Sequence, residues 1–322
     1  MLFAPLAAPA RMHIPDGFLS APVSIVLWIL SLLVIGYALK RVGKDLGERQ
    51  VPMMGVLAAC IFAGQMLNFA VAGGTSGHLL GAAIATILLG PWAAVLVMTS
   101  VVSIQALIFQ DGGLVVLGAN LFNMAVVGVF VSYFVYRTIQ RIASGRTWGI
   151  FIGGFVAAWT AIFVAALAAA LQLAFSGTSR ADIAIPAMGG VHALIGIGEG
   201  AITLGALSFL SATRRDLFRV DRAQPAGGRF VWVVGLIIAF GLAVISPLAS
   251  THPDGLEWVA EQQGFLNLAQ APTYQIIPDY VLPGVPDEAL ATILAGIIGT
   301  LIVFGVAFAI AYTRRNRAMG RG

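Results

Sequence analysis

The 322-residue chain is 59% hydrophobic and only 10% charged, and its mean hydropathy is +0.93. Soluble globular domains carry about a quarter of charged residues, so this composition excludes that class. The net charge of +4 does not indicate nucleic-acid binding, because the basic residues lie in short segments between apolar runs. We therefore expect an all-α polytopic membrane protein with no nucleic-acid partner.

Residues 1–11 form a leader that does not resemble a signal peptide, because no basic residue precedes Arg11 and two prolines interrupt the apolar stretch. Nine apolar runs follow, at 18–39, 52–72, 76–89, 91–109, 114–136, 148–175, 186–211, 230–248 and 289–312. Runs of about 20 apolar residues are typical of membrane-spanning helices. The sequence thus predicts about nine transmembrane helices, of which the third is short.

The third and fourth runs are separated at Gly90-Pro91, because proline does not continue a helix comfortably. This division places four basic clusters, at 40–49, 137–146, 214–229 and 314–321, on one side of the membrane. The positive-inside rule identifies that side as cytoplasmic. Of the 18 basic residues only Arg11 and Arg180 lie on the other side, so the N-terminus is expected outside and the C-terminus inside.

The same topology puts all four histidines at outer ends of spans or in outer loops: His13, His78, His192 and His252. Imidazole is the commonest metal ligand and suits nickel, cobalt, copper and zinc. A lone histidine at a membrane surface is more often a wetted polar side chain, and that interpretation is favoured for His252. His13 and His78 form the stronger pair, since a glycine-rich loop carries His78.

Met12 and His13 form a chelate if Met12 is the first residue of the mature chain. The terminal amine, the deprotonated amide of His13 and its imidazole can close two fused rings on one ion, nearly in a plane. An imidazole from His78 completes a square-planar set of four nitrogens, the geometry that Ni(II) and Cu(II) prefer. From spacing alone, a metal site and a structural role for the two histidines are equally open.

Other polar residues are candidates for supporting the site rather than for binding the cation. His192 and Glu199 are seven residues apart and share one helix face, and Glu199 is the only acidic residue well inside an apolar run. The alternative for both is hydrogen bonding in helix packing. Four further residues either support the metal site or only make structural hydrogen bonds: Asp16, Asp111, Asn120 and Asn123.

Four motifs resemble the CbiM/NikM family, the substrate-binding membrane components of energy-coupling factor transporters for cobalt and nickel. They are MHIPDGFLS, GGTSGHLLG, QDGGLVVLGANLFNMA and GGVHALIGIGEGAIT, which begin at residues 12, 73, 110 and 189. The resemblance implies a seven-helix core over residues 12–213 in the bacterial plasma membrane. It also implies that Met12, His13 and His78 are the metal ligands.

The leader departs from the family pattern, because an acylated nitrogen cannot serve as the amine ligand. Either translation begins at Met12, or a peptidase removes residues 1–11. The first explanation is favoured, since the leader makes a poor signal peptide.

Residues 230–322 resemble the small PDGLE-type, NikN-like accessory subunit of the same transporters, fused to the core through a basic cytoplasmic linker at 214–229. Two spans here flank an outer segment that contains THPDGLEWVAEQQGF, from residue 251, and a proline-rich stretch. By resemblance, this region helps to load or release the metal. The similarity between HIPDG and HPDG is attributed to the common use of Pro-Asp-Gly in turns.

The sequence contains no G-x-x-x-x-G-K-[ST] motif and no chain of embedded carboxylates, so the protein is not expected to drive transport alone. The resemblance implies a transmembrane coupling subunit and two cytoplasmic ATPases as partners, with Co²⁺ or Ni²⁺ as cargo rather than cofactor. The alternatives are a self-powered secondary transporter of divalent metals and, less favoured, a membrane metalloenzyme or a histidine-ligated haem protein. A metalloprotease would show H-E-x-x-H on a span, which this sequence lacks.

Overall fold

The computed structural model describes residues 13–45, 47, 50–213 and 228–319, and nearly all of its regular structure is helical. Six of the described helical segments are long and apolar enough to span a membrane: Ala21–Val42, Pro91–Phe109, Leu117–Ile142, Thr147–Phe175, Ala181–Thr213 and Glu288–Arg317. Two shorter apolar helices, Gln50–Gln65 and Trp232–Leu248, accompany them. The prediction of a helical, multi-pass membrane protein is therefore confirmed.

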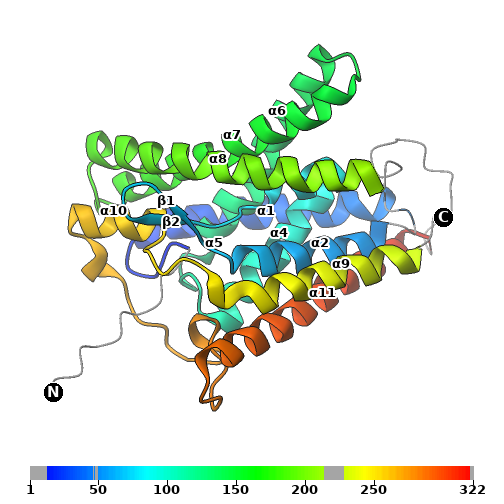
Figure 1. Cartoon of the computed structure of the whole chain (residues 1–322). Coiled ribbons are helices and arrows are strands. Elements are labelled where there is room, and N and C mark those ends of the chain that lie inside the picture. The colour runs from blue at the N-terminus through cyan, green and yellow to red at the C-terminus, as the bar shows by residue number, and fades with distance from the viewer. Residues whose placement is uncertain (1–12, 46, 48–49, 214–227, 320–322) are drawn as a thin grey trace.

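Most of the long helices lie side by side with their axes roughly aligned, whereas the helix of residues 128–142 projects obliquely from the bundle (Figure 1). In chain order they begin with α1 (Ala21–Asp45), α2 (Gln50–Gln65), α3 (Ala82–Leu89) and α4 (Pro91–Ile104). After them come α5 (Leu117–Leu121), α6 (Gly128–Ile142), α7 (Thr147–Phe175) and α8 (Ala181–Thr213). The last three are α9 (Gly228–Ile245), α10 (Gly255–Gln263) and α11 (Glu288–Met319).

The region between α2 and α4 differs from two regular spans. The chain leaves α2 at Gln65 and forms a short antiparallel hairpin, β1 (Phe69–Val71) with β2 (Thr75–Gly77), before α3 begins. At 1.5 Å per residue, the eight residues of α3 cover about 12 Å, well short of the ~30 Å apolar thickness of a bilayer. The apolar run 76–89 therefore contains only a half-length helix.

The predicted break between the third and fourth runs is present. Gly90 follows α3 with φ +81°, in the left-handed region that glycine tolerates, and Pro91 is the first residue of α4. The amide of Gly90 donates to the Thr86 carbonyl at 2.9 Å and so closes the last turn of α3. The chain therefore turns at Gly90-Pro91 instead of continuing as one long helix.

Two π-helical segments interrupt regular helices beside loops that carry polar residues of the candidate site described below. One is η1 (Gln105–Phe109), which continues α4 and ends at Gln110 with φ +56°. The other is η2 (Phe122–Val127), which lies between α5 and α6 and contains Asn123. Such segments occur mostly as local bulges, frequently at functional sites, because the extra residue re-aims the side chains around it.

Helices α7 and α8 pack closely through small residues. Ala157, Ala158 and Ala161 are fully buried on α7, and a Cβ on Gly196 of α8 would stand 2.7 Å from the Trp159 ring. The Trp159 indole N–H donates to the Ala193 carbonyl across the pair at 2.9 Å. Small residues on both helices thus permit a close contact between α7 and α8 within this chain.

The C-terminal helices belong to the same bundle. Helices α9 and α11 both pack along α2, and Gly55 and Gly235 provide the close approaches, to Phe304 and Val56 respectively. The segment between them, residues 246–287, returns to the end of the bundle that carries the β1–β2 hairpin, where α10 lies (Figure 1). We call it the accessory segment. It also contains three single-turn 3₁₀ helices, η4 (Ser246–Leu248), η5 (Leu266–Leu268) and η6 (Pro278–Tyr280).

Candidate metal site

Residues 13–17 cross the loop before α5 and are held there through their backbone. The Ile14 amide donates to Asn120 Oδ1 at 3.1 Å, and Asn120 Nδ2 donates to the Ile14 carbonyl at 3.0 Å. The Gly113 amide donates to the same carbonyl at 2.9 Å. The Asn120 side chain thus bonds both the backbone N–H and the backbone C=O of Ile14, as a neighbouring β-strand would, and so fixes the backbone next to His13.

Asp16 fastens the same segment to residues 114–116. Its carboxylate accepts from the amides of Leu114, Val115 and Val116 at 3.0, 2.9 and 3.1 Å. Gly113 packs against Asp16 so closely that a Cβ would overlap the carboxylate. Hydrogen bonds to an ionised acceptor are roughly twice as strong as neutral ones, so this contact holds the N-terminal segment firmly in register.

His13 is buried beside Asp111, which follows η1. Nδ1 of His13 lies 2.9 Å from Asp111 Oδ1, and the Tyr280 hydroxyl donates to Asp111 Oδ2 at 2.6 Å. Burial alone would raise the pKa of Asp111, but His13 and the Tyr280 hydrogen bond together outweigh it and hold that pKa below its ordinary value. Nε2 of His13 is buried with no hydrogen-bond partner among the described residues.

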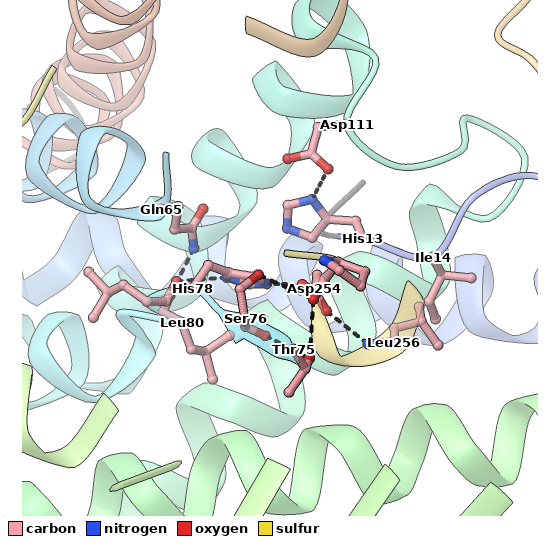
Figure 2. A network of polar contacts seen from close by, with 12 residues as sticks. His13, Ile14, Gln65, Thr75, Ser76, His78, Leu80, Asp111, Asp254 and Leu256 are labelled. Atoms are coloured by element: carbon pink, nitrogen blue, oxygen red, sulfur yellow. Dashed lines mark hydrogen bonds and ion pairs between the residues drawn. The ribbon is translucent and has the colours of Figure 1, made fainter. Parts of the chain in front are cut away.

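His78 stands in the loop between β2 and α3, and both of its ring nitrogens have oxygen neighbours. Nδ1 lies 3.1 Å from the Leu79 carbonyl, and Nε2 lies 3.3 Å from Asp254 Oδ2. Burial disfavours the imidazolium, but the contacts with Asp254 and Leu79 prevail and raise the pKa of His78 to about 9. Figure 2 shows His13 beside Asp111 and His78 beside Asp254. The two imidazole rings are 5.6 Å apart, centre to centre.

The loop of His78 is held from the bundle by two buried side chains. Glu199, on α8, accepts from the Leu80 amide at 2.7 Å and from the Gly81 amide at 3.0 Å, so both carboxylate oxygens are used. Gln65, the last residue of α2, donates to the Leu80 carbonyl at 2.9 Å. Glu199 therefore supports the backbone two and three residues after His78, immediately before α3 begins.

His192 and Asn123 complete the polar lining. Nδ1 of His192 lies 2.8 Å from the Met188 carbonyl, and since a carbonyl only accepts, this nitrogen carries the proton. Asn123 pairs with Gln172 of α7 through two reciprocal amide hydrogen bonds, of 2.9 and 2.6 Å.

A cavity of about 80 Å³ lies among these residues. Its polar lining comes from His13, His78, Asn120, Asn123, His192 and Asp254, and its apolar wall includes Met124, Ile162, Ala165, Met188 and Ile195. Pockets for organic molecules typically measure about 300–1,000 Å³. The volume therefore suits a small ion better than an organic ligand.

The structure thus gathers the predicted site residues from distant parts of the chain. The cavity is lined by His13, His78, Asn120, Asn123 and His192. Asp111 contacts Nδ1 of His13. Asp16 holds the N-terminal segment, and Glu199 holds the loop of His78. Met12 and the leader lie outside the described residues. His252 is exposed and does not line the cavity, although its carbonyl accepts from Ser76 Oγ at 2.8 Å.

Sequence reasoning missed four residues that contact the site residues or their loops. Gln65 donates to the Leu80 carbonyl, Gln172 pairs with Asn123, Tyr280 donates to Asp111, and Asp254 contacts His78. For Asp254 a signal was available, because His252-Pro253-Asp254-Gly255 repeats the Pro-Asp-Gly turn that follows His13. Tyr280 and Gln172 lie in segments without any distinctive pattern.

Comparisons with known proteins show which families the chain resembles. The family model described as "Cobalt uptake substrate-specific transmembrane region" (CbiM) matches residues 13–217, and that of the PDGLE domain matches residues 229–316. A "Putative fused nickel transport protein NikMN" of Archaeoglobus fulgidus is 39% identical over 93% of this chain and 98% of its own. A "Fused nickel transport protein NikMN" of Rhodobacter capsulatus is 32% identical over 96% of this chain and 100% of its own.

Solved structures show the same likeness. A crystal structure of a truncated transition metal transporter is 36% identical and superposes with a TM-score of 0.56, covering 63% of this chain and 99% of its own. The relatives and this structural neighbour are named as metal transport proteins and not as enzymes.

Proposed function

The chain belongs to the CbiM family of cobalt uptake transmembrane proteins, fused to a PDGLE domain, and from that premise we propose that it captures Co²⁺ or Ni²⁺ with high affinity for an ATP-driven energy-coupling factor importer. The cation is cargo, so it is bound reversibly at the outer end of the bundle. In this proposal residues 12–213 are the capture unit, residues 214–229 the linker and residues 230–322 the accessory region.

The observation that carries the proposal is the approach of two imidazoles to 5.6 Å at a small buried cavity. They come from the N-terminal segment and from a loop 65 residues further on, and separate buried side chains hold each of them. Two imidazoles that line one small cavity can bind a single divalent cation, because imidazole is the commonest metal ligand in proteins.

The ligand set that we propose is the amine of Met12, the amide and imidazole of His13, and the imidazole of His78. Within the described ranges no three His, Cys, Asp or Glu side chains form a metal-binding group, so backbone nitrogens are needed to complete four donors. Four nitrogens in a plane suit Ni(II) better than Co(II). The six-membered ring of this chelate closes only through Nδ1 of His13, so the cation takes the position beside Nδ1 that Asp111 Oδ1 now occupies.

Transport itself requires partners in this proposal. The sequence has no nucleotide-binding motif, so a transmembrane coupling subunit and two cytoplasmic ATPases supply the energy. The exposed apolar face of α1, which includes Ile25, Ile29 and Leu33, is suited to the lipid bilayer. Metal uptake by cells that express this chain without any ATPase partner would instead favour a self-powered transporter.

Metal titration of the purified full-length protein tests the proposed site. His13→Ala and His78→Ala are each expected to abolish stoichiometric Ni²⁺ or Co²⁺ binding, whereas His252→Ala, at an exposed histidine, should bind like the wild type. Unchanged metal content in His78→Ala would refute the site.

Sequencing of the N-terminus of the membrane-inserted protein tests the amine ligand separately. The expected first residues are Met-His-Ile-Pro, starting at Met12. A mature chain that begins at Met1 would contradict the chelate.

A further inference from the structure

The fused accessory segment reaches into the cation site through a short backbone pairing with the β1–β2 hairpin. The Ser76 amide donates to the Pro253 carbonyl at 2.8 Å, and Ser76 and Asp254 form a single parallel β-bridge. The hydroxyl of Thr75 donates to the same carbonyl at 3.1 Å. Thr75, Ser76 and Asp254 are all buried, so this pairing is an internal part of the fold.

That pairing positions the Asp254 carboxylate so that its two oxygens make different contacts. Oδ1 accepts from the Leu256 amide at 2.8 Å and caps α10, while Oδ2 lies 3.3 Å from Nε2 of His78. The next residue, Gly255, packs so tightly on α8 that a Cβ would stand 2.8 Å from Ile195 and 3.0 Å from His192. The carboxylate is therefore fixed from both sides and cannot move away from His78 without disturbing α10.

We propose, on the basis of the function proposed above, that Asp254 is a positioning residue for the cation: it holds the His78 imidazole through Nε2 and so directs Nδ1 to the metal. A carboxylate that accepts from the second ring nitrogen is the usual support of a metal-binding histidine, because it fixes both the tautomer and the ring orientation. The competing contact of Nδ1 with the Leu79 carbonyl is neutral and therefore the weaker of the two, so it is the one exchanged for the cation.

This assignment makes the accessory region part of the site. His78 is supplied by the core, and the group that orients it is supplied from 176 residues further along the chain. The cation site is then complete only while the accessory segment lies on the hairpin.

Asp254→Asn in the full-length protein isolates the positioning role, because asparagine caps a helix as well as aspartate does. The matched control is Asp287→Asn, since Asp287 caps α11 in the same way, accepting from the Leu290 amide at 2.7 Å, on an exposed part of the accessory region. Loss of a supporting carboxylate typically weakens metal binding about 10–100-fold, and that is the expected rise in the Ni²⁺ Kd of Asp254→Asn. Asp287→Asn should stay within about twofold of the wild type.

The ligand-field spectrum of the Ni²⁺-saturated protein separates positioning from a general loss of structure. Asp254→Asn is expected to shift the band, because the bond to His78 changes, while Asp287→Asn leaves it unchanged. An unaltered or higher Ni²⁺ affinity in Asp254→Asn would overturn the inference. A higher Ni²⁺ affinity would mean that Asp254 competes with the cation for His78. If His78→Ala loses Ni²⁺ while Asp254→Asn does not, only this inference fails. If His78→Ala also binds normally, the proposed function fails with it.

Discussion

Glu199→Gln is the substitution whose effect the structure defines best. Glu199 is fully buried, and its two oxygens accept from the amides of Leu80 and Gly81. Glutamine keeps one acceptor and turns an NH₂ group towards the other amide, so one hydrogen bond is lost and two buried donors face each other without an acceptor. Each of these losses costs about 1–3 kcal/mol, which gives about 2–4 kcal/mol of destabilisation when their partial overlap is allowed for.

Thermal unfolding of the detergent-solubilised protein measures this loss, and Ni²⁺ titration of the same samples shows whether it reaches His78. We expect a lower unfolding temperature together with weaker Ni²⁺ binding, because the two supported amides lie only two and three residues after His78. Glu261→Gln, at an exposed position on α10, is the matched control and should change neither quantity. A Glu199→Gln protein with wild-type unfolding temperature and Ni²⁺ affinity would show that the carboxylate does not hold this loop.

Two further predictions concern the histidines. The pKa of His78 is raised from 6.5 to about 9, so the stabilising contact with Asp254 is fully present below about pH 6.5 and is lost as the pH rises through about 9. The unfolding temperature of the metal-free protein should therefore fall between these two pH values. In Asp254→Asn the unfolding temperature should depend less on pH across the same interval. Gly112→Ala should weaken Ni²⁺ binding, because Gly112 has φ +93° and a Cβ would stand 2.8 Å from the Cβ of His13. The control is Gly145→Ala, at φ +74° in open space, which carries similar backbone strain and should leave the Ni²⁺ affinity unchanged. Equal effects of the two substitutions on Ni²⁺ affinity would contradict the argument from contact with His13.

The helical bundle was predictable because apolar run length and loop charge are strong signals in a membrane protein. The break at Gly90-Pro91 was equally clear, since both residues have conformations that oppose helix continuation. The β1–β2 hairpin was not. Residues 66–81 mix apolar with small residues and fit the end of one span and the start of the next, and hydropathy does not distinguish a half-length helix from a complete one.

For the site, the sequence identified the histidines and several supporting residues, but not which residue contacts which histidine. Four histidines in 322 residues are conspicuous, and loop topology alone placed them at one end of the bundle. The pairing of each carboxylate with its histidine has no such signal, because Asp111 and Asp254 lie 98 and 176 residues beyond the histidines that they contact. Tyr280 is harder still, since a single tyrosine in a proline-rich stretch has no spacing that links it to Asp111.

The two Pro-Asp-Gly turns show why a local interpretation of sequence falls short here. Both aspartates accept backbone amides, as such turns commonly do, but Asp16 accepts from a loop about a hundred residues away whereas Asp254 caps the helix that it begins. Only Asp254 has a second oxygen aimed at a histidine, because the pairing of Ser76 with Pro253 brings it there. The same turn thus anchors the N-terminal segment in one place and orients a metal ligand in the other, and tertiary contacts decide which.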